Sequence, residues 1–461
     1  MAQKPSIPKG TRDFSAVEVA KRQYIMGIIK HHFECFGYLP IETPSFENSE
    51  TLIGKYGEEG DRLIFKILNS GDYLSKVSPE ILAQNNSQKL TPLVSEKALR
   101  YDLTVPFARY VVQHQNDIVF PFKRFQMQPV WRADRPQKGR FREFYQCDAD
   151  VVGSDSLWQE VELIKLYDAV FCDLGLEGVV IKINNRKILA GIAEVIGAAD
   201  KLIDFTVALD KLDKIGAESV RQEMLDKGIL DESIQKAQVL FELKGSIFEK
   251  IELLSHLLAH SKEGLKGIEE LQFICNNISK LGLKNAVLDL DVTLARGLNY
   301  YTGAIFEVAS PPSVAMGSIG GGGRYDDLTG IFGLKNMSGV GISFGLDRIY
   351  LVLEALDLFS KTVLPTTELL FLNQGKDHEF ASMMAVSKLR DAGLKVEFYP
   401  DDTKIGKQYL YAEKRQIAYV ATINTLHNEP QTYTLKRLDT GESQQLTLEK
   451  LKEEIGFLDK I

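Results

Sequence analysis

Basic side chains crowd into residues 123–142, and these are the residues best suited to bind a highly charged ligand. Arginine keeps its charge and holds phosphate oxygens with a fork of N–H donors. A solvated run of charges could have the same composition, but aromatic runs flank this one, and Pro136 and Gly139 shape it. The pattern therefore favours a polyphosphate site. Its basic residues are Lys123, Arg124, Arg132, Arg135, Lys138, Arg140 and Arg142, with Asp134 as the one acid among them.

Two more segments could line such a site. Residues 317–328, GSIGGGGRYDDL, could let the backbone approach a ligand closely, or could form a flexible surface loop. They are not a P-loop, because no Gly-Lys-Ser/Thr follows. Residues 296–303, RGLNYYTG, put Arg296 beside Tyr300 and Tyr301 in a strand-like stretch. A cation and two phenols could share a pocket there, or the tyrosines could belong to the core.

The remaining candidate residues are less distinctive. Arg348 falls in the first turn of a helix that leaves a strand, a position also typical of a surface arginine. His256 and His260 have i, i+4 spacing without the glutamate of a metalloprotease helix. The cysteines form no CxxC pair, so neither a zinc knuckle nor a disulfide framework is expected. They are Cys35, Cys147, Cys172 and Cys275.

Short elements must position these side chains. Residues 15–36 are predicted to form a first helix, because their apolar residues recur at helical spacing and Ser15 and Glu18 have the spacing of a capping box. Residues 120–152 read as strand, long basic loop and strand. Strand character returns over residues 287–309, and residues 339–356 predict a strand that runs directly into a helix.

The length of 461 residues suggests about three domains. We expect a catalytic domain made of residues 1–185 and 286–356, interrupted by a helical insertion at 186–285 that is rich in Leu, Ile, Lys, Glu and Ala. Residues 357–367 resemble a linker. The alternation of strands and helices over 366–461 predicts a separate small α/β domain.

Composition excludes several classes of protein. Hydrophobic residues make up 44% and charged residues 26%, as in ordinary globular proteins, and the net charge of −8 argues against a nonspecific nucleic-acid coat protein. A local basic patch could still bind nucleic acid. The first residues contain no apolar signal segment, and no apolar run reaches membrane-spanning length, so we expect a cytoplasmic protein that does not enter a membrane.

Taken together and in order, these segments resemble the histidyl-tRNA synthetase family of class II aminoacyl-tRNA synthetases, over nearly the whole chain. Residues 36–47, with Pro44, are similar to motif 1 of the class, 122–153 to motif 2, and 339–353 to motif 3. Segments similar to ones typical of the histidine family are 99–110, 295–307 and 321–328.

The resemblance implies an α+β fold, in which an antiparallel sheet with flanking helices carries a helical insertion and a C-terminal α/β anticodon-binding domain. It also implies a two-step reaction. The carboxylate of histidine attacks the α-phosphate of ATP to give histidyl-adenylate and pyrophosphate. The 3′-hydroxyl of the terminal adenosine of tRNA(His) then takes the histidyl group.

The family pattern assigns the ATP site to four arginines. Arg132 and Arg296 would be the catalytic pair, approaching the α-phosphate from opposite sides and neutralising charge as the pentavalent centre forms. Arg348 would face the adenine and γ-phosphate, and Arg140 the distal phosphates. No protein metal site is expected, because Mg²⁺ would bind chiefly through ATP oxygens.

The pattern also implies a histidine pocket. Its residues would be Asp102, Thr104, Gln146, Asp150, Tyr300 and Tyr301. The first three would receive the α-ammonium group, Asp150 and Tyr301 would bind the two imidazole nitrogens, and Tyr300 would wall the pocket. Asp102 and Asp150 stand where glutamate is common in the family, and Asn299 where aspartate is usual. Such a pocket rejects analogues strongly, so no editing domain is expected.

The remaining implied contacts are with tRNA and a second subunit. Gln137 would meet the acceptor end, residues 186–285 would contact tRNA, and residues 366–461 would bind the anticodon. Motif 1 would build a homodimer. Two alternatives stay open: a non-catalytic histidine-binding regulatory paralogue, and a synthetase for another amino acid such as threonine or proline.

Overall fold

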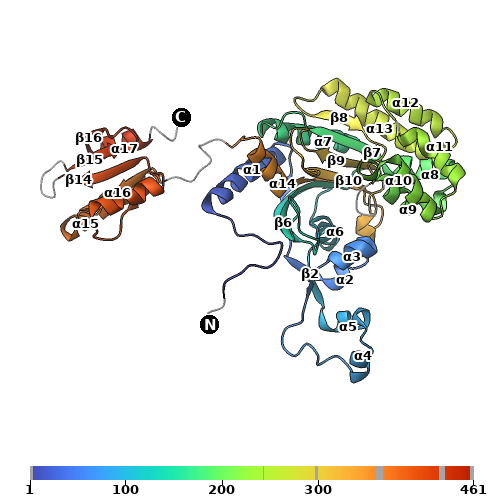
Figure 1. Ribbon diagram of the computed structural model, residues 1–461, viewed down its shortest axis with the longest axis horizontal. Helices are drawn as coiled ribbons and strands as arrows, with labels where there is room; N and C mark the ends of the chain where they lie inside the picture. The colour runs from blue at the N-terminus through green and yellow to red at the C-terminus, as the bar shows by residue number, and fades with distance from the viewer. Residues whose placement is uncertain (1–3, 242, 296–299, 360–366, 425–430, 457–461) are drawn as a thin grey trace. The chain divides into compact units, whose positions relative to one another are not determined.

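The computed structural model describes residues 4–241, 243–295, 300–359, 367–424 and 431–456. The chain divides into two compact units, Met1–Ser360 and Lys361–Ile461, shown in Figure 1. None of the helices in the described ranges combines the length and apolar character needed to cross a lipid bilayer.

A twisted eight-stranded sheet forms the centre of the first unit (Figure 1). The strand order is β1-β5-β6-β11-β10-β9-β7-β8, and all pairs between β5 and β7 are antiparallel. The two edge pairs, β1 with β5 and β7 with β8, are parallel. The bounds are β1 Leu39–Pro40, β5 Phe122–Trp131, β6 Glu143–Val152, β7 Val180–Asn185, β8 Val287–Leu290, β9 Ala304–Ala309, β10 Gly320–Tyr325 and β11 Gly339–Gly345.

Helices cover one face of this sheet along β6 and β11. They are α1 Ala16–Cys35, α7 Trp158–Asp173 and α14 Leu346–Ala355. The capping box predicted for the first helix is present, because Ser15 and Glu18 satisfy each other's backbone N–H groups. Phe33, Phe171 and Phe344 meet in the core beneath these helices. The α+β class and the antiparallel centre of the sheet agree with the prediction. The parallel pairing at the two edges was not predicted.

The glycine-rich segment is a strand rather than a surface loop. β10 lies between β9 and β11, and its glycines are needed because neighbouring backbone comes very close. A Cβ on Gly322 would lie 2.1 Å from the carbonyl oxygen of Gly341, and one on Gly320 would lie 2.9 Å from the ring of Tyr167. Tyr167 of α7 donates its hydroxyl to the carbonyl oxygens of Gly321 and Ser343, at 3.0 Å each.

The strand expected across residues 287–309 is interrupted. β8 ends at Leu290 and β9 begins at Ala304, and Tyr300 and Tyr301 lie in the connection before β9. The prediction that the tyrosines sit within a strand is therefore wrong. Alternation of polar and apolar residues cannot separate a strand from an irregular connection whose tyrosines are partly buried. Arg296 and Asn299 lie outside the described residues.

On the opposite face of the sheet, a three-stranded sheet of order β2-β4-β3 and several short helices form a smaller layer. Their apolar side chains, including Val105 and Phe107, pack with Tyr325 of β10. The elements are β2 Phe46–Asn48, β3 Lys66–Ile67, β4 Lys97–Leu99, α2 Ser49–Leu52, α3 Gly57–Leu63, α4 Pro79–Ala83, α5 Ser87–Val94, α6 Thr104–Gln113 and the 3₁₀ helix η2 Leu328–Phe332.

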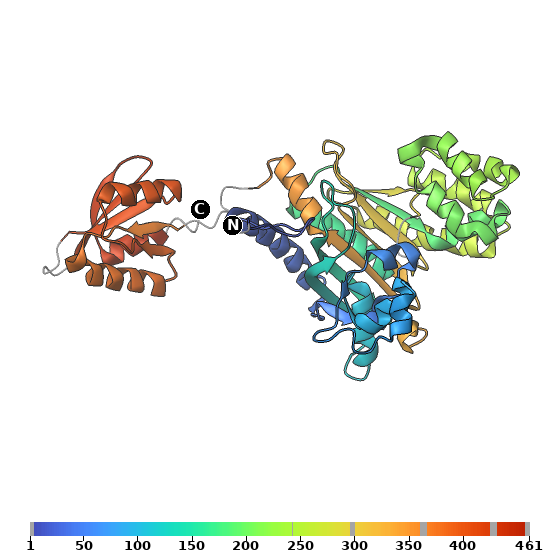
Figure 2. The ribbon, with the colours of Figure 1, turned by 60° about the horizontal axis from the view of Figure 1, so that its bottom comes forward.

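Helices fill the chain between β7 and β8 and gather at the β7 end of the sheet (Figure 2). They are α8 Arg186–Val195, η1 Ala199–Lys201, α9 Leu202–Leu209, α10 Leu212–Asp226, α11 Asp231–Phe241, α12 Ile247–Leu257 and α13 Lys262–Leu281. Gly191 of α8 and Gly264 of α13 let these helices approach closely, since a Cβ on Gly191 would lie 2.6 Å from the Cα of Gly264.

In its described residues, the second unit is a five-stranded sheet of order β13-β12-β14-β15-β16 with three helices. β12 pairs in parallel with both β13 and β14, and β14, β15 and β16 are antiparallel. Its own apolar core includes Phe371, Leu389 and Leu451. The bounds are β12 Leu369–Phe371, α15 Lys376–Asp391, β13 Val396–Phe398, α16 Ile405–Lys414, β14 Tyr419–Ile423, β15 Thr432–Arg437, β16 Ser443–Thr447 and α17 Leu448–Gly456.

The close contact at Gly322 predicts a specific sensitivity of the fold. Gly322→Ala should lower the apparent Tm, at a cost of about 3 kcal/mol, because the new methyl group meets backbone that cannot rotate away. Gly321→Ala is the matched control, since its Cβ would meet its nearest atom at 3.2 Å. Thermal unfolding followed by circular dichroism measures both, and equal Tm values for the two variants would contradict the steric argument.

Candidate active site

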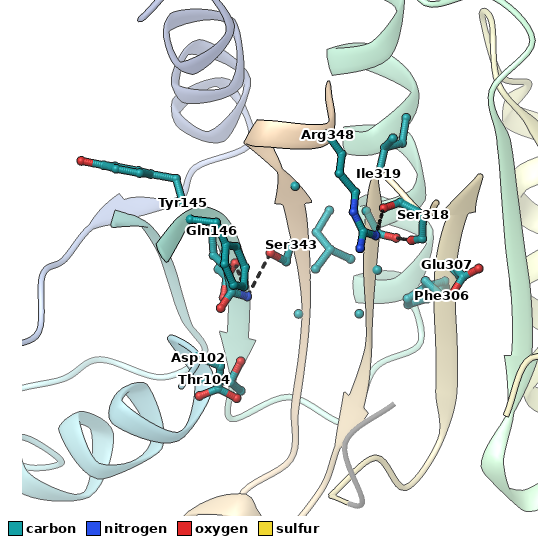
Figure 3. Close-up of a pocket in the computed structure, with 18 of the residues that line it drawn as sticks. Asp102, Thr104, Tyr145, Gln146, Phe306, Glu307, Ser318, Ile319, Ser343 and Arg348 are labelled. Atoms are coloured by element: carbon teal, nitrogen blue, oxygen red, sulfur yellow. Dashed lines mark hydrogen bonds between the residues drawn. The ribbon is translucent and has the colours of Figure 1, made fainter. Parts of the chain in front are cut away.

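A cavity of about 380 Å³ opens on the face of the central sheet opposite α1 and α7. It is lined by β6, β9, β10 and β11, the start of α6, the basic loop after β5 and the first turn of α14 (Figure 3). The structure brings together nine of the predicted site residues in its wall. They are Asp102, Thr104, Arg132, Arg140, Gln146, Asp150, Tyr300, Tyr301 and Arg348.

Two of the arginines are held by backbone carbonyl groups. Arg132, directly after β5, donates from Nε to the carbonyl oxygen of Tyr101 at 3.0 Å, and its guanidinium lies 4.3 Å from the ring centroid of Tyr101. Arg348 donates to the carbonyl oxygens of Gly139 and Ser318, at 2.9 and 2.6 Å. These contacts fix the direction of each guanidinium while its positive charge remains, as anion binding requires.

Arg140 lies at the exposed rim. Its Nε is 3.3 Å from Asp134 Oδ2, and 48% of its side chain is exposed. Backbone hydrogen bonds of 3.1 and 2.9 Å between Gln137 and Arg140 close the tip of the basic loop, and Gly139 supplies the positive φ of that turn. Gln137 is exposed and does not line the cavity.

Asp102 is buried among phenols. Its carboxylate accepts hydrogen bonds from Tyr56 Oη at 2.9 Å, from Tyr300 Oη at 3.3 Å and from the backbone N–H of Val105 at 3.1 Å. Burial raises the pKa of Asp102, and Arg132 and the hydrogen bonds oppose that shift. Because these groups stabilise the ionised form of Asp102, this end of the cavity offers a buried negative charge that can bind a cation.

Asp150 forms the second buried carboxylate, on β6. Its Oδ2 lies 2.7 Å from Nη2 of the fully buried Arg124, and Tyr325 Oη donates to its Oδ1 at 2.6 Å. Burial raises the pKa of Asp150, and Arg124 and Tyr325 oppose the rise. Gly341 is required opposite, because a Cβ there would lie 1.9 Å from Oδ1. Burial also raises the pKa of the nearby Tyr301 hydroxyl, so that it stays protonated and able to donate.

The geometry thus gathers guanidinium groups at one side of a cavity and buried carboxylates with phenols at another. A sequence profile of the histidyl-tRNA synthetase family matches residues 10–349, a span that includes all nine cavity-lining residues predicted above. The chain belongs to the histidyl-tRNA synthetase family. A profile described as an anticodon binding domain matches residues 368–457, within the second unit.

Individual members of the histidyl-tRNA synthetase family agree over the full length. A histidine–tRNA ligase of Flavobacterium johnsoniae is 66% identical, covering 98% of this chain and 99% of its own. One of Christiangramia forsetii is 67% identical, covering 97% and 98%. The crystal structure of histidyl-tRNA synthetase from Nostoc is similar with a TM-score of 0.80 and 31% identity, covering 99% of each chain.

Several cavity residues of this histidyl-tRNA synthetase family member were not singled out from the sequence. Asp148, Ser343 and Tyr325 line the cavity, as does Glu307 of β9. The alternation of apolar and polar residues along β6 could have identified Asp148 as a residue of the cavity face. Cys147, Ala149 and Val151 join the core, so the residues between them must face the other way.

Asp148 should make the stability of the fold depend on pH. Burial and the neighbouring Asp150 raise its pKa from 3.8 to about 7 against the opposing charge of Arg124. A raised carboxyl pKa means that the folded state holds a proton that the unfolded state releases, so stability falls as pH rises from about 4 to about 7.

Asp148→Asn removes that charge. We expect the apparent Tm of the variant, relative to the parent, to increase between pH 5 and pH 8, by an amount that corresponds to roughly 1–3 kcal/mol. The exposed Asp155→Asn is the matched control and should show no such pH dependence. A Tm difference between Asp148→Asn and the parent that stays constant with pH would show that Asp148 is ionised throughout.

Proposed function

We propose that this chain activates histidine with ATP to form histidyl-adenylate and transfers the histidyl group to the 3′ end of tRNA(His). The observation that carries the proposal is the shared cavity, in which fixed arginines lie beside buried carboxylates and phenols. Membership of a ligase family supports the reaction type.

In the first step, the carboxylate of histidine attacks the α-phosphate of ATP. Arg132 stabilises the negative charge that grows on the α-phosphate oxygens, because its guanidinium is already oriented by Tyr101. Arg296, which lies outside the described residues, is assigned to the other side of the same phosphate by the family pattern. A well-placed arginine contributes roughly 10³-fold or more to such phosphoryl chemistry.

The remaining arginines bind the rest of the nucleotide. Arg348 binds the adenine and γ-phosphate from the first turn of α14, where Gly139 and Ser318 fix its guanidinium. Arg140 binds the distal phosphates from the rim, where its exposure lets it move with an entering or leaving pyrophosphate.

Mg²⁺ fits this site as a companion of ATP. Among the described residues no three His, Cys, Asp or Glu side chains converge as a metal site would require. Glu307 and Asp134 are carboxylates that line the cavity and would add to the phosphate oxygens as ligands. The ion supplies positive charge to the phosphates, and the residues of this chain supply the orientation.

The opposite end of the cavity selects the amino acid. Asp102, with Thr104 and Gln146, receives the α-ammonium group, since a carboxylate beside neutral polar groups suits a cation. Asp150 and Tyr301 bind the two imidazole nitrogens, and Tyr300 walls the pocket. A wrong amino acid would leave these buried polar groups without hydrogen-bond partners. The free-energy cost is large enough to reject that amino acid without a separate editing site.

The partners follow from the same assignment. The second unit binds the anticodon, the insertion at 186–285 contacts tRNA, and Gln137 meets the acceptor end from the exposed tip of the basic loop. The motif 1 segment, 36–47, pairs two copies of the chain as a homodimer. The compartment proposed is the cytoplasm, where tRNA is charged.

Amino-acid-dependent exchange of pyrophosphate into ATP tests the proposed activation step. We expect exchange with histidine alone among the twenty amino acids, because only its side chain satisfies both Asp150 and Tyr301. Exchange with threonine or proline would assign the chain a different substrate. Histidine binding with no exchange would identify a regulatory paralogue, a reading that the retained Arg132 and Arg348 argue against.

Single substitutions should separate the two ends of the cavity. Arg132→Ala should lower histidine-dependent exchange roughly 10³-fold while calorimetry shows unchanged histidine affinity, and Arg296→Ala should do the same. Asp150→Ala should instead weaken histidine binding at least tenfold, because the imidazole loses the carboxylate that accepts its N–H. Unchanged histidine affinity in Asp150→Ala would remove this residue from the pocket.

A further inference from the structure

Asp148 is a buried carboxylate in the cavity wall to which the proposed reaction assigns no role. It lies on β6 between Gln146 and Asp150, and only 2% of it is exposed. Because side chains two residues apart share a face of a strand, Gln146, Asp148 and Asp150 form one polar row along the cavity. Across the sheet, Asp148 pairs with Ser343 of β11.

The hydrogen bonds of this row fix the amide of Gln146. Nε2 of Gln146 lies 3.2 Å from Ser343 Oγ, drawn in Figure 3, and 3.4 Å from Asp148 Oδ1. The NH₂ group of the amide therefore lies within hydrogen-bonding distance of two acceptors in the wall. Oε1 of Gln146 is buried and has no hydrogen-bond partner among the described residues.

The direction of that amide matters for recognition. Above its pKa of about 7, Asp148 is ionised and only accepts hydrogen bonds, so that it selects the NH₂ end of Gln146 and excludes the flipped orientation. The atom left over, Oε1, is an acceptor and suits a donor such as an ammonium group. A buried acceptor without a partner is costly until a ligand supplies the donor.

We propose that Asp148, together with Ser343, is a positioning residue that holds the amide of Gln146 so that Oε1 accepts a hydrogen bond from the α-ammonium group of the amino-acid substrate. The inference rests on the proposed function for the identity of that substrate. Asp148 acts through Gln146 and does not touch the reacting atoms.

Binding of two ligands that differ only in the ammonium group tests the inference. Histidine and 3-(imidazol-4-yl)propionate, which lacks the α-amino group, are compared by calorimetry, the second in competition with histidine. Asp148→Asn should weaken histidine about tenfold, as expected for one hydrogen bond to a charged group, and leave the affinity for the deamino compound unchanged. Asp155→Asn, at an exposed position, is the charge-matched control.

A structural role predicts a different pattern. If Asp148 served only the fold, losing its attraction to Arg124 would lower the Tm of Asp148→Asn and weaken both ligands equally. The positioning role instead leaves the variant at least as stable as the parent at pH 8. Ser343→Ala, which removes the other acceptor of the amide, should lower the histidine preference in the same direction.

A double-mutant cycle shows whether Asp148 acts through Gln146. Gln146→Ala should already abolish the preference for histidine over the deamino compound, and adding Asp148→Asn should cost little more. Additive losses, equal losses for both ligands, or no loss would overturn the inference. If the parent protein binds no histidine, both the proposed function and this inference are overturned. If the parent binds histidine, the results for the variants test the role of Asp148 alone.

Discussion

The ion pair between Arg124 and Asp150 is the interaction on which the cavity depends. Both side chains are almost fully buried, and their closest atoms are 2.7 Å apart. A buried carboxylate without compensation would cost several kcal/mol or take up a proton, and Asp148 shows this tendency through its raised pKa. By keeping negative charge inside the sheet, Arg124 lets the protein hold buried hydrogen-bond acceptors in the cavity wall, which the proposed function assigns to an imidazole and an ammonium group.

Strand β6 couples this chemistry to the fold. One of its faces carries Cys147, Ala149 and Val151 into the main core, and the other carries the polar row of the cavity. A shift of register by one residue would exchange the two faces, so the same core contacts that stabilise the sheet also place the site. Gly341 and Gly322 matter because they lack side chains. A Cβ on Gly341 would collide with Asp150, and a Cβ on Gly322 would collide with the backbone of β11.

Much of this was predictable from the sequence where the pattern was local. The capping box at Ser15 and the strand, loop and strand around Arg132 follow from neighbouring residues, and the family resemblance gathered nine cavity residues that lie far apart in the chain. Composition could not distinguish strand β10 from a loop. Its glycines are required by close contacts with β11 and α7, which lie far away in the sequence. The parallel edge pairing of β1 and the partner of Asp150, Arg124, depend on long-range contacts that no local spacing records.

The proposed function requires that the nucleotide and the amino acid meet end to end in a single cavity. A crystal structure with ATP and histidinol, which lacks the attacking carboxylate, measures this directly. We predict the imidazole ring within hydrogen-bonding distance of Asp150 and Tyr301, with the α-phosphate against Arg132. Phosphates seated at the Asp102 and Asp150 end, or an imidazole bound outside the cavity, would contradict the account.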